Sequence, residues 1–188
     1  MLSLSLYSLE SRLTRSANTV FELVGFLPKL QNLHLDFYCC QLTEVGAKKT
    51  SRVVFPFIRT LKLSKLDLGN SIELSCALKM IRRFSSLQNL EITSTKRNAS
   101  PFPQVEYNTI RLRSVVITSF KGLENEVGFI KYILACSPFL EKIAIYPEYS
   151  LTTSDRLTLT MKLLKLHRAS LIAEIDFTNV SRYDIDQD

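Results

Sequence analysis

Apolar residues recur along the chain in one short pattern: an apolar residue, two variable positions, a second apolar residue, one variable position and a third apolar residue. The alternation of the last two apolar positions is typical of a β-strand with one buried face. Successive matches to this pattern start 25 to 32 residues apart, which indicates an internal repeat. The matches are Met1/Leu4/Leu6, Leu30/Leu33/Leu35, Ile58/Leu61/Leu63, Leu87/Leu90/Ile92, Leu112/Val115/Ile117, Leu140/Ile143/Ile145 and, weakly, Ile172/Ile175/Phe177.

The segments between the predicted strands carry apolar residues at helical spacing. Asn70 and Glu73 stand at the N-cap and N3 positions of one such segment, and Pro138 ends another. Residues 157–161 alternate apolar and polar side chains and would also fit a strand. A helix is favoured because the parallel strand that follows needs a crossover connection before it. The predicted apolar helix faces are Val20/Leu23/Val24/Leu27, Leu74/Ala77/Leu78/Ile81, Val127/Ile130/Leu134 and Leu157/Met161/Leu164.

A single helix–strand unit of this kind cannot bury its own apolar face, so neighbouring units must stack. The sequence therefore predicts an α/β leucine-rich-repeat solenoid, a curved parallel sheet with helices on its outer side. Residues 39–53 and 95–109 interrupt the repeat and are either surface loops or flanks of a partner-binding face. The first strand lacks a preceding cap and is expected to fray or self-associate, whereas the polar residues 181–188 are expected to close the array.

Several segments resemble plant F-box/leucine-rich-repeat proteins. Residues 20–24 leading into 27–30, and 73–78 leading into 86–90, resemble their repeats. Residues 112–141 resemble their C-terminal FBD domain, and residues 168–175 resemble its end. The resemblance implies leucine-rich repeats over 1–109, an FBD-like domain over 110–180 that continues the array, and a polar tail over 181–188.

In the family that the chain resembles, an F-box docks on the Skp adaptor of a cullin-based ubiquitin ligase and the repeats hold the substrate. The chain starts at the first position of a repeat strand, so we expect an N-terminally truncated array without an F-box and without Skp adaptor binding. The usual Asn or Cys eight places after the first leucine is also missing, which predicts less regular turns after the strands. These positions hold Tyr38, Leu66, Thr95, Phe120, Glu148 and Val180.

Composition and charge narrow the classes of partner. Lys and Arg number 24 against 18 Asp and Glu, but they are dispersed over predicted helices and loops, which argues against specific nucleic-acid binding. No apolar run is long enough to span a membrane, and no signal-peptide pattern opens the chain. The cysteines are expected to be reduced thiols, which favours the cytoplasm or nucleus. They are Cys39, Cys40, Cys76 and Cys136.

Alternate strand residues should point away from the core and form an exposed sheet face. Its mixed, mildly acidic character suits contact with a protein or a small molecule better than contact with a phosphate backbone. The candidate partner-binding residues are Asn32, His34, Asp36, Lys62, Glu91, Lys142, Tyr146, Glu174 and Asp176.

Catalytic, cofactor and metal motifs are absent from the sequence. His34 and His167 are interpreted as a sheet-face and a helix-terminal histidine, and Glu124 and Glu126 as acidic residues at a helix start. No phosphate-binding, dinucleotide or zinc spacing occurs, so the sequence predicts neither an enzyme nor a cofactor. It favours the substrate-recognition region of an SCF-type ubiquitin ligase subunit. The alternatives are a truncated regulatory or non-functional fragment and a small-molecule-sensing leucine-rich repeat.

Overall fold

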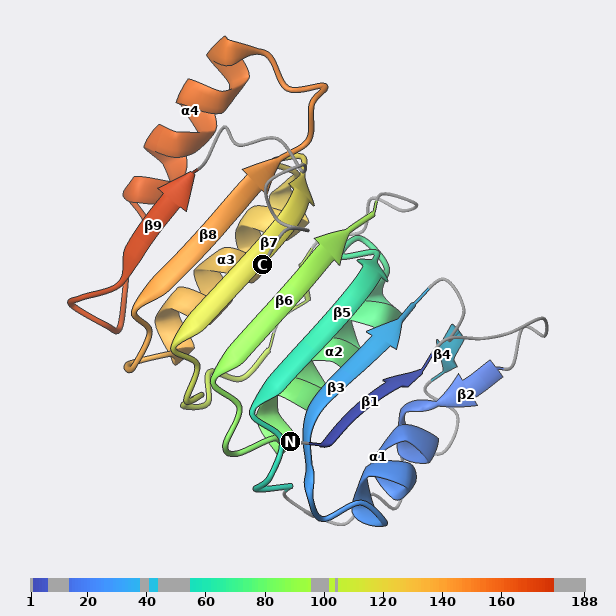
Figure 1. The fold of residues 1–188 in the computed structure, drawn as a ribbon. Helices are drawn as coiled ribbons and strands as arrows, with labels where there is room; N and C mark the ends of the chain where they lie inside the picture. Colours follow the sequence, from blue (N-terminus) through green and yellow to red (C-terminus); the bar gives the residue numbers. More distant parts are fainter. Residues whose placement is uncertain are drawn as a thin grey trace.

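All seven repeat matches coincide with strands of one parallel sheet, in the order β1-β3-β5-β6-β7-β8-β9 (Figure 1). The computed structural model describes residues 2–6, 14–37, 41–43, 55–95, 102–103 and 105–177. The strands are β1 (Leu2–Leu6), β3 (Leu30–Asp36), β5 (Thr60–Leu66), β6 (Asn89–Ser94), β7 (Ser114–Phe120), β8 (Lys142–Pro147) and β9 (Glu174–Phe177).

The register of the sheet follows the repeat. The middle apolar residue of each match pairs with the middle residue of the next match, through all six neighbouring strand pairs. This alignment stacks the apolar side chains of successive units in one row on the inner face of the sheet. The residues of the row are Leu4, Leu33, Leu61, Leu90, Val115, Ile143 and Ile175.

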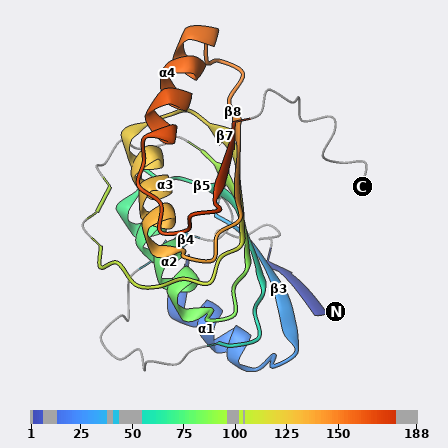
Figure 2. The same ribbon diagram turned by 90° about the vertical axis from the view of Figure 1, so that its left-hand side faces the viewer.

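The helices of the described residues lie on one side of this sheet (Figure 2), which confirms the predicted α/β leucine-rich-repeat solenoid. They are α1 (Ala17–Gly25), α2 (Ser71–Arg83), α3 (Glu124–Cys136) and α4 (Thr153–Leu164). A small parallel pair, β2 (Thr14–Ser16) with β4 (Gln41–Thr43), lies beside α1 (Figure 1) and is not predicted by the repeat pattern.

The core fills the space between the sheet and the helices. The first leucine or isoleucine of five successive matches is 0% exposed: Leu30, Ile58, Leu87, Leu112 and Leu140. Full burial of one such side chain stabilises the fold by roughly 1.5–3 kcal/mol. Because each of these residues packs between units, the core is continuous along the array. Of the predicted face of α1, Val20 and Val24 are buried, and the side chain of Leu23 lies outside those described.

Carboxylates at the third position of the helices tie down the loops that precede them. Glu73 of α2 accepts a hydrogen bond from the backbone N–H of Asp67 at 2.9 Å, and Glu126 of α3 accepts from Leu123 at 3.1 Å. In α4, Asp155 accepts from the backbone N–H of Thr152 at 3.2 Å. The predicted N-cap and N3 pair of α2, Asn70 and Glu73, is confirmed by the bond from the Glu73 backbone N–H to Asn70 Oδ1.

Buried apolar residues occupy two of the positions where a typical repeat has asparagine. Leu66 and Phe120 are both 0% exposed, and the residue before each, Lys65 and Ser119, has a positive φ of 57° and 58°. The strand register shifts at both places, so these strands end in an irregular turn. The carboxylates of Glu73 and Glu126 in the following helices accept hydrogen bonds from the backbone N–H groups just after these strands, at Asp67 and Lys121.

The prediction for the apolar face of α4 is wrong, although the helix itself is confirmed. Leu157, Met161 and Leu164 are 65%, 54% and 52% exposed. The helix packs instead through Leu163, which is 0% exposed, and the partly buried Leu159. A stripe at helical spacing establishes that a helix forms, but it does not establish which neighbour covers the stripe.

Candidate partner-binding face

All nine candidate residues lie on strands of the seven-stranded sheet. Their neighbours in sequence, such as Leu33, Leu35 and Ile143, are buried against the helices, so alternation directs the candidates to the opposite side. We call that side the sheet face. None of the described helices covers it (Figure 2). The register brings His34 beside Lys62, and Lys62 beside Glu91.

Charged residues of the sheet face pair with one another across neighbouring strands. Lys62 Nζ lies 3.3 Å from Glu91 Oε2, and Lys142 Nζ lies 2.9 Å from Asp176 Oδ2. The hydrogen bond and the charge of Asp176 raise the pKa of Lys142. Because all four side chains are about half exposed, solvent screens both pairs and they contribute little to stability. Their main effect is to leave the face with little unbalanced charge.

Uncharged residues separate the two ion pairs. Val116 of β7 stands between Glu91 and Ala144, and Ala144 stands between Val116 and Asp176. Thr118 donates a hydrogen bond to Thr93 Oγ1 at 3.0 Å, and Tyr146 of β8 is partly exposed. We call Val116, Thr118 and Tyr146, which are partly exposed, together with Ala144 between them, which is buried, the central strip. The alternation of the sequence predicts that these residues lie on the sheet face. That they form its uncharged centre follows only from the structure, in which an ion pair lies on each side of them.

Asp36 is buried and is therefore not an open contact site. It is 6% exposed, and its Oδ2 lies 3.1 Å from Lys65 Nζ. Lys65 is not among the residues that strand alternation predicts for this face, because alternation breaks down at the irregular end of β5. The two residues between Leu63 and Leu66, where one is usual, are the sequence signal of this irregularity. The pair connects β3 to β5 at the end of the face.

His34 connects the same two strands. Its Nε2 lies 2.8 Å from Ser64 Oγ on β5. Burial, and after it the positive charge of Lys62, lowers the pKa of His34, while Asp36 and Glu91 act in the opposite direction. The neutral imidazole is therefore the form that the folded sheet favours.

The depressed pKa of His34 predicts a loss of stability in acid. The unfolded chain binds the proton at the ordinary pKa of about 6.5, whereas the folded chain binds it only at lower pH. The contribution of His34 is therefore complete above about pH 6.5 and is lost as the pH falls through the folded pKa. We expect the free energy of unfolding to fall more steeply between about pH 7 and 5 for the native chain than for His34→Gln, as measured by urea titration. Parallel curves would contradict this assignment.

The described part of the 95–109 interruption packs on the helix layer, not beside the sheet face. The Phe102 and Tyr107 rings lie 6.2 and 5.7 Å from the ring of Tyr132 on α3. Arg82 donates to Tyr132 Oη at 3.1 Å and to the Glu106 carbonyl at 3.3 Å. The hypothesis that this interruption flanks the partner-binding face is therefore wrong for residues 102–103 and 105–109. Residues 44–53 lie outside the described residues.

Basic residues of the helices make local contacts. The guanidinium of Arg83 lies 4.4 Å from the centre of the Phe21 ring, where burial lowers its pKa. Arg82 contacts Tyr132 in the same layer. Several further basic residues of the sequence lie outside the described residues: Arg12, Lys48, Lys49, Arg52, Lys96 and Arg97.

The described residues contain no group of three His, Cys, Asp or Glu side chains that could hold a metal ion, and none of their helices is long and apolar enough to cross a bilayer. His34 and Ser64 are in contact across the interior strands β3 and β5. Cys76 and Cys136 are buried thiols, and Cys39 and Cys40 lie outside the described residues.

A stacked array of helix–strand units with one open sheet face defines a leucine-rich-repeat protein. Comparison with known families adds a match to the FBD family over residues 106–145, which include β7 and α3. An F-box/FBD/LRR-repeat protein of Arabidopsis thaliana is 25% identical over 194 aligned positions, which cover 94% of this chain and 45% of that protein. No solved structure matches the chain.

Both similarities agree with the resemblance of the sequence to the plant F-box/FBD/leucine-rich-repeat family. It spans less than half the length of the curated relative that it matches. Proteins of this family are of a protein-interaction type.

Proposed function

We propose that the chain is the partner-holding region of an SCF-type ubiquitin ligase subunit and that it binds a substrate protein on the sheet face. In this proposal, residues 1–109 are the repeat part and residues 110–180 the FBD part of the same array. The observation that carries the proposal is the open sheet face, with its uncharged central strip between two ion pairs. The resemblance to a relative whose name includes an F-box supports the ligase assignment.

The make-up of the face favours a protein partner. Tyrosine at the centre of a surface, bordered by polar groups, is typical of protein interfaces. A phosphate backbone would instead require unpaired basic residues, whereas Lys62 and Lys142 are each paired with a carboxylate. A small-molecule sensor would require convergent polar groups around an enclosed pocket, whereas the charged groups Lys62/Glu91 and Lys142/Asp176 of this face pair with one another across neighbouring strands. We therefore propose a binding protein without catalytic activity, cofactor or specific nucleic-acid partner.

The buried thiols of Cys76 and Cys136 support a reducing compartment. We propose the cytoplasm or the nucleus, where a ubiquitin ligase subunit would meet its substrate. Formation of a native disulfide by either residue would argue against this location.

Photo-cross-linking from two tyrosine positions tests the proposed surface. A benzophenone amino acid replaces Tyr146 on the sheet face in one variant and Tyr107, which is 64% exposed on the helix layer, in the other. After irradiation in a plant extract, we expect a protein to be attached through position 146 and not through position 107. Attachment of the same proteins from position 107 alone would contradict the proposal.

A further inference from the structure

The exposed apolar residues of α4 have the spacing of a helix-packing surface. Leu157, Met161 and Leu164, which we call the α4 stripe, are exposed, whereas Leu163 on another side of the helix is buried in the array. The three positions of the stripe are related as i, i+4 and i+7, so they form one ridge about two turns long. A partner helix contacts such a ridge with its own residues at the same spacing. The stripe therefore fits a helical partner.

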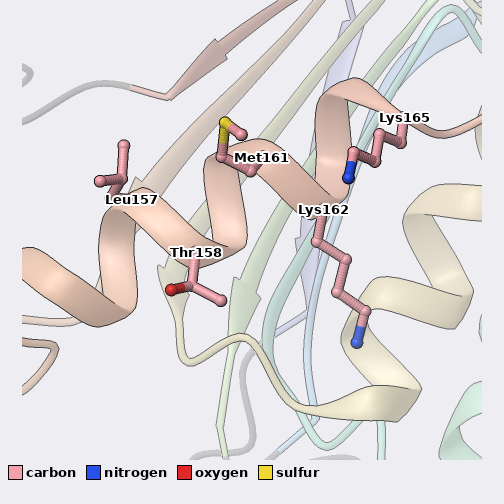
Figure 3. Close-up of a pocket in the computed structure, with 5 residues that line it drawn as sticks. All are labelled: Leu157, Thr158, Met161, Lys162 and Lys165. Carbon is pink, nitrogen blue, oxygen red and sulfur yellow. The ribbon is translucent and has the colours of Figure 1, made fainter.

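A groove on α4 joins the stripe to two lysines. It is lined by Leu157, Thr158, Met161, Lys162 and Lys165 (Figure 3). Figure 3 shows Leu157 and Met161 projecting from one side of α4 and Lys162 from the other. At 100° per residue, the lining spans about 140° of the helix circumference, from Leu157 at its apolar border to Lys162 at its basic border. A single partner in this groove would touch apolar and basic side chains together.

The two lysines of the groove differ from those of the sheet face in their pairing. Lys62 and Lys142 each have a carboxylate oxygen within 3.3 Å and 2.9 Å of Nζ. Across the part of the chain that the structure describes, neither Lys162 nor Lys165 forms an ion pair. The groove thus carries positive charge that the fold does not neutralise, and carboxylates of a partner would complement it.

This charge distinguishes between the possible occupants of the stripe. A second copy of the chain, paired through the same helix, would bring together two surfaces of the same positive charge, which is unfavourable. Helices that lie on a bilayer typically carry Trp or Phe on their apolar side, and α4 has no aromatic residue. An amphipathic helix with acidic residues beside its apolar stripe matches both the hydrophobicity and the charge of the groove.

We propose that α4 binds an acidic amphipathic helix of a partner protein. Apolar residues of that helix cover Leu157, Met161 and Leu164, and its carboxylates pair with Lys162 and Lys165. The surface belongs to the helix side of the array and not to the sheet face (Figure 2). The proposal therefore does not depend on what the sheet face binds, and one molecule can hold both partners at once.

Fluorescence anisotropy with two labelled synthetic peptides tests the proposal. Each peptide has three heptads with leucine at the a and d positions. One carries glutamate at the e and g positions, and the other carries lysine there, so that like charges keep each peptide from pairing with itself. We expect the native chain to bind the glutamate peptide at least about tenfold more tightly than the lysine peptide at low salt, with a smaller preference at high salt.

Two variants locate the binding. Lys162→Glu/Lys165→Glu should reverse the preference, so that the lysine peptide binds about tenfold more tightly. Met161→Asp should lower the affinity for the glutamate peptide at least about tenfold, because a carboxylate then stands in the middle of the stripe. Lys29→Glu/Lys131→Glu is the matched control, since it changes the net charge equally at two exposed lysines outside the groove, and it should keep the native preference. All the replaced side chains are exposed, so the fold should tolerate the changes, which circular dichroism verifies.

Three results would overturn the proposal. The first is equal affinity of the native chain for the two peptides, or an affinity for the glutamate peptide that Met161→Asp leaves unchanged. The second is self-association of the native chain, measured by sedimentation, that Met161→Asp abolishes, because a second copy would then cover the stripe. The third is binding to phosphatidylserine vesicles that Met161→Asp abolishes, without binding of the glutamate peptide. Preference for the glutamate peptide in the native chain and the control, reversed in Lys162→Glu/Lys165→Glu, is the result that we expect.

Discussion

Replacement of Glu126 by alanine is expected to lower the free energy of unfolding by about 3 kcal/mol. Glu126 is only 1% exposed. Its Oε2 accepts hydrogen bonds from the backbone N–H groups of Lys121 and Leu123 at 2.9 and 3.1 Å, and its Oε1 accepts from Ser94 Oγ at 2.6 Å. Alanine would leave three donors without an acceptor, and the Ser94 hydroxyl would remain buried.

Glu124→Ala is the matched control, since Glu124 lies in the same first turn of α3 but is exposed. Its removal should cost no more than about 0.5–1 kcal/mol, the usual worth of an acidic side chain at a helix start. Urea titration monitored by circular dichroism measures both values. If the two variants lost equal stability, the role of Glu126 in holding the loop between β7 and α3 would be disproved.

These two glutamates illustrate what the sequence can predict about the fold. Both are identifiable from the sequence as acidic residues at the start of a helix. Only packing distinguishes them, because Glu126 points to β6 of the preceding unit and Glu124 points to solvent. The strands are predictable because the repeat pattern appears seven times and the register preserves it. The buried side of α4 is not predictable from its own periodicity, since it depends on which neighbours are present.

The candidate face is predictable to a similar extent. Strand alternation correctly identifies the side of the sheet that carries His34, Lys62 and Glu91. It fails at the strand ends, where Asp36 is buried and the positive φ of Lys65 breaks the alternation. The pairing of charges also depends on register, which a repeat of varying length does not determine. The central strip therefore becomes visible only in the folded sheet.

A lysine in place of Val116 is expected to weaken binding of the partner by about 30-fold or more, equivalent to about 2 kcal/mol. Val116 is partly exposed at the middle of the face, between Glu91 and Ala144. A lysine there would bring a charge into the centre of the interface, where it must lose its water, and would compete with Lys62 for Glu91. Because Val116 is only partly buried, the fold itself should tolerate the change.

Lys131→Glu supplies the comparison on the other side of the molecule. Lys131 is exposed on α3, in the helix layer. Reversal of its charge changes the net charge by two but leaves the sheet face unaltered. We expect it to change the affinity for the partner by less than about twofold at physiological salt, because exposed charges outside an interface are screened.

The measurement that tests the central claim most directly is calorimetric titration of the cross-linked partner, once purified, into the native chain, Val116→Lys and Lys131→Glu. If the sheet face holds the partner, the dissociation constant rises by about 30-fold or more for Val116→Lys and stays within about twofold for Lys131→Glu. Native affinity in Val116→Lys together with lost affinity in Lys131→Glu would place the partner on the helices and contradict the account.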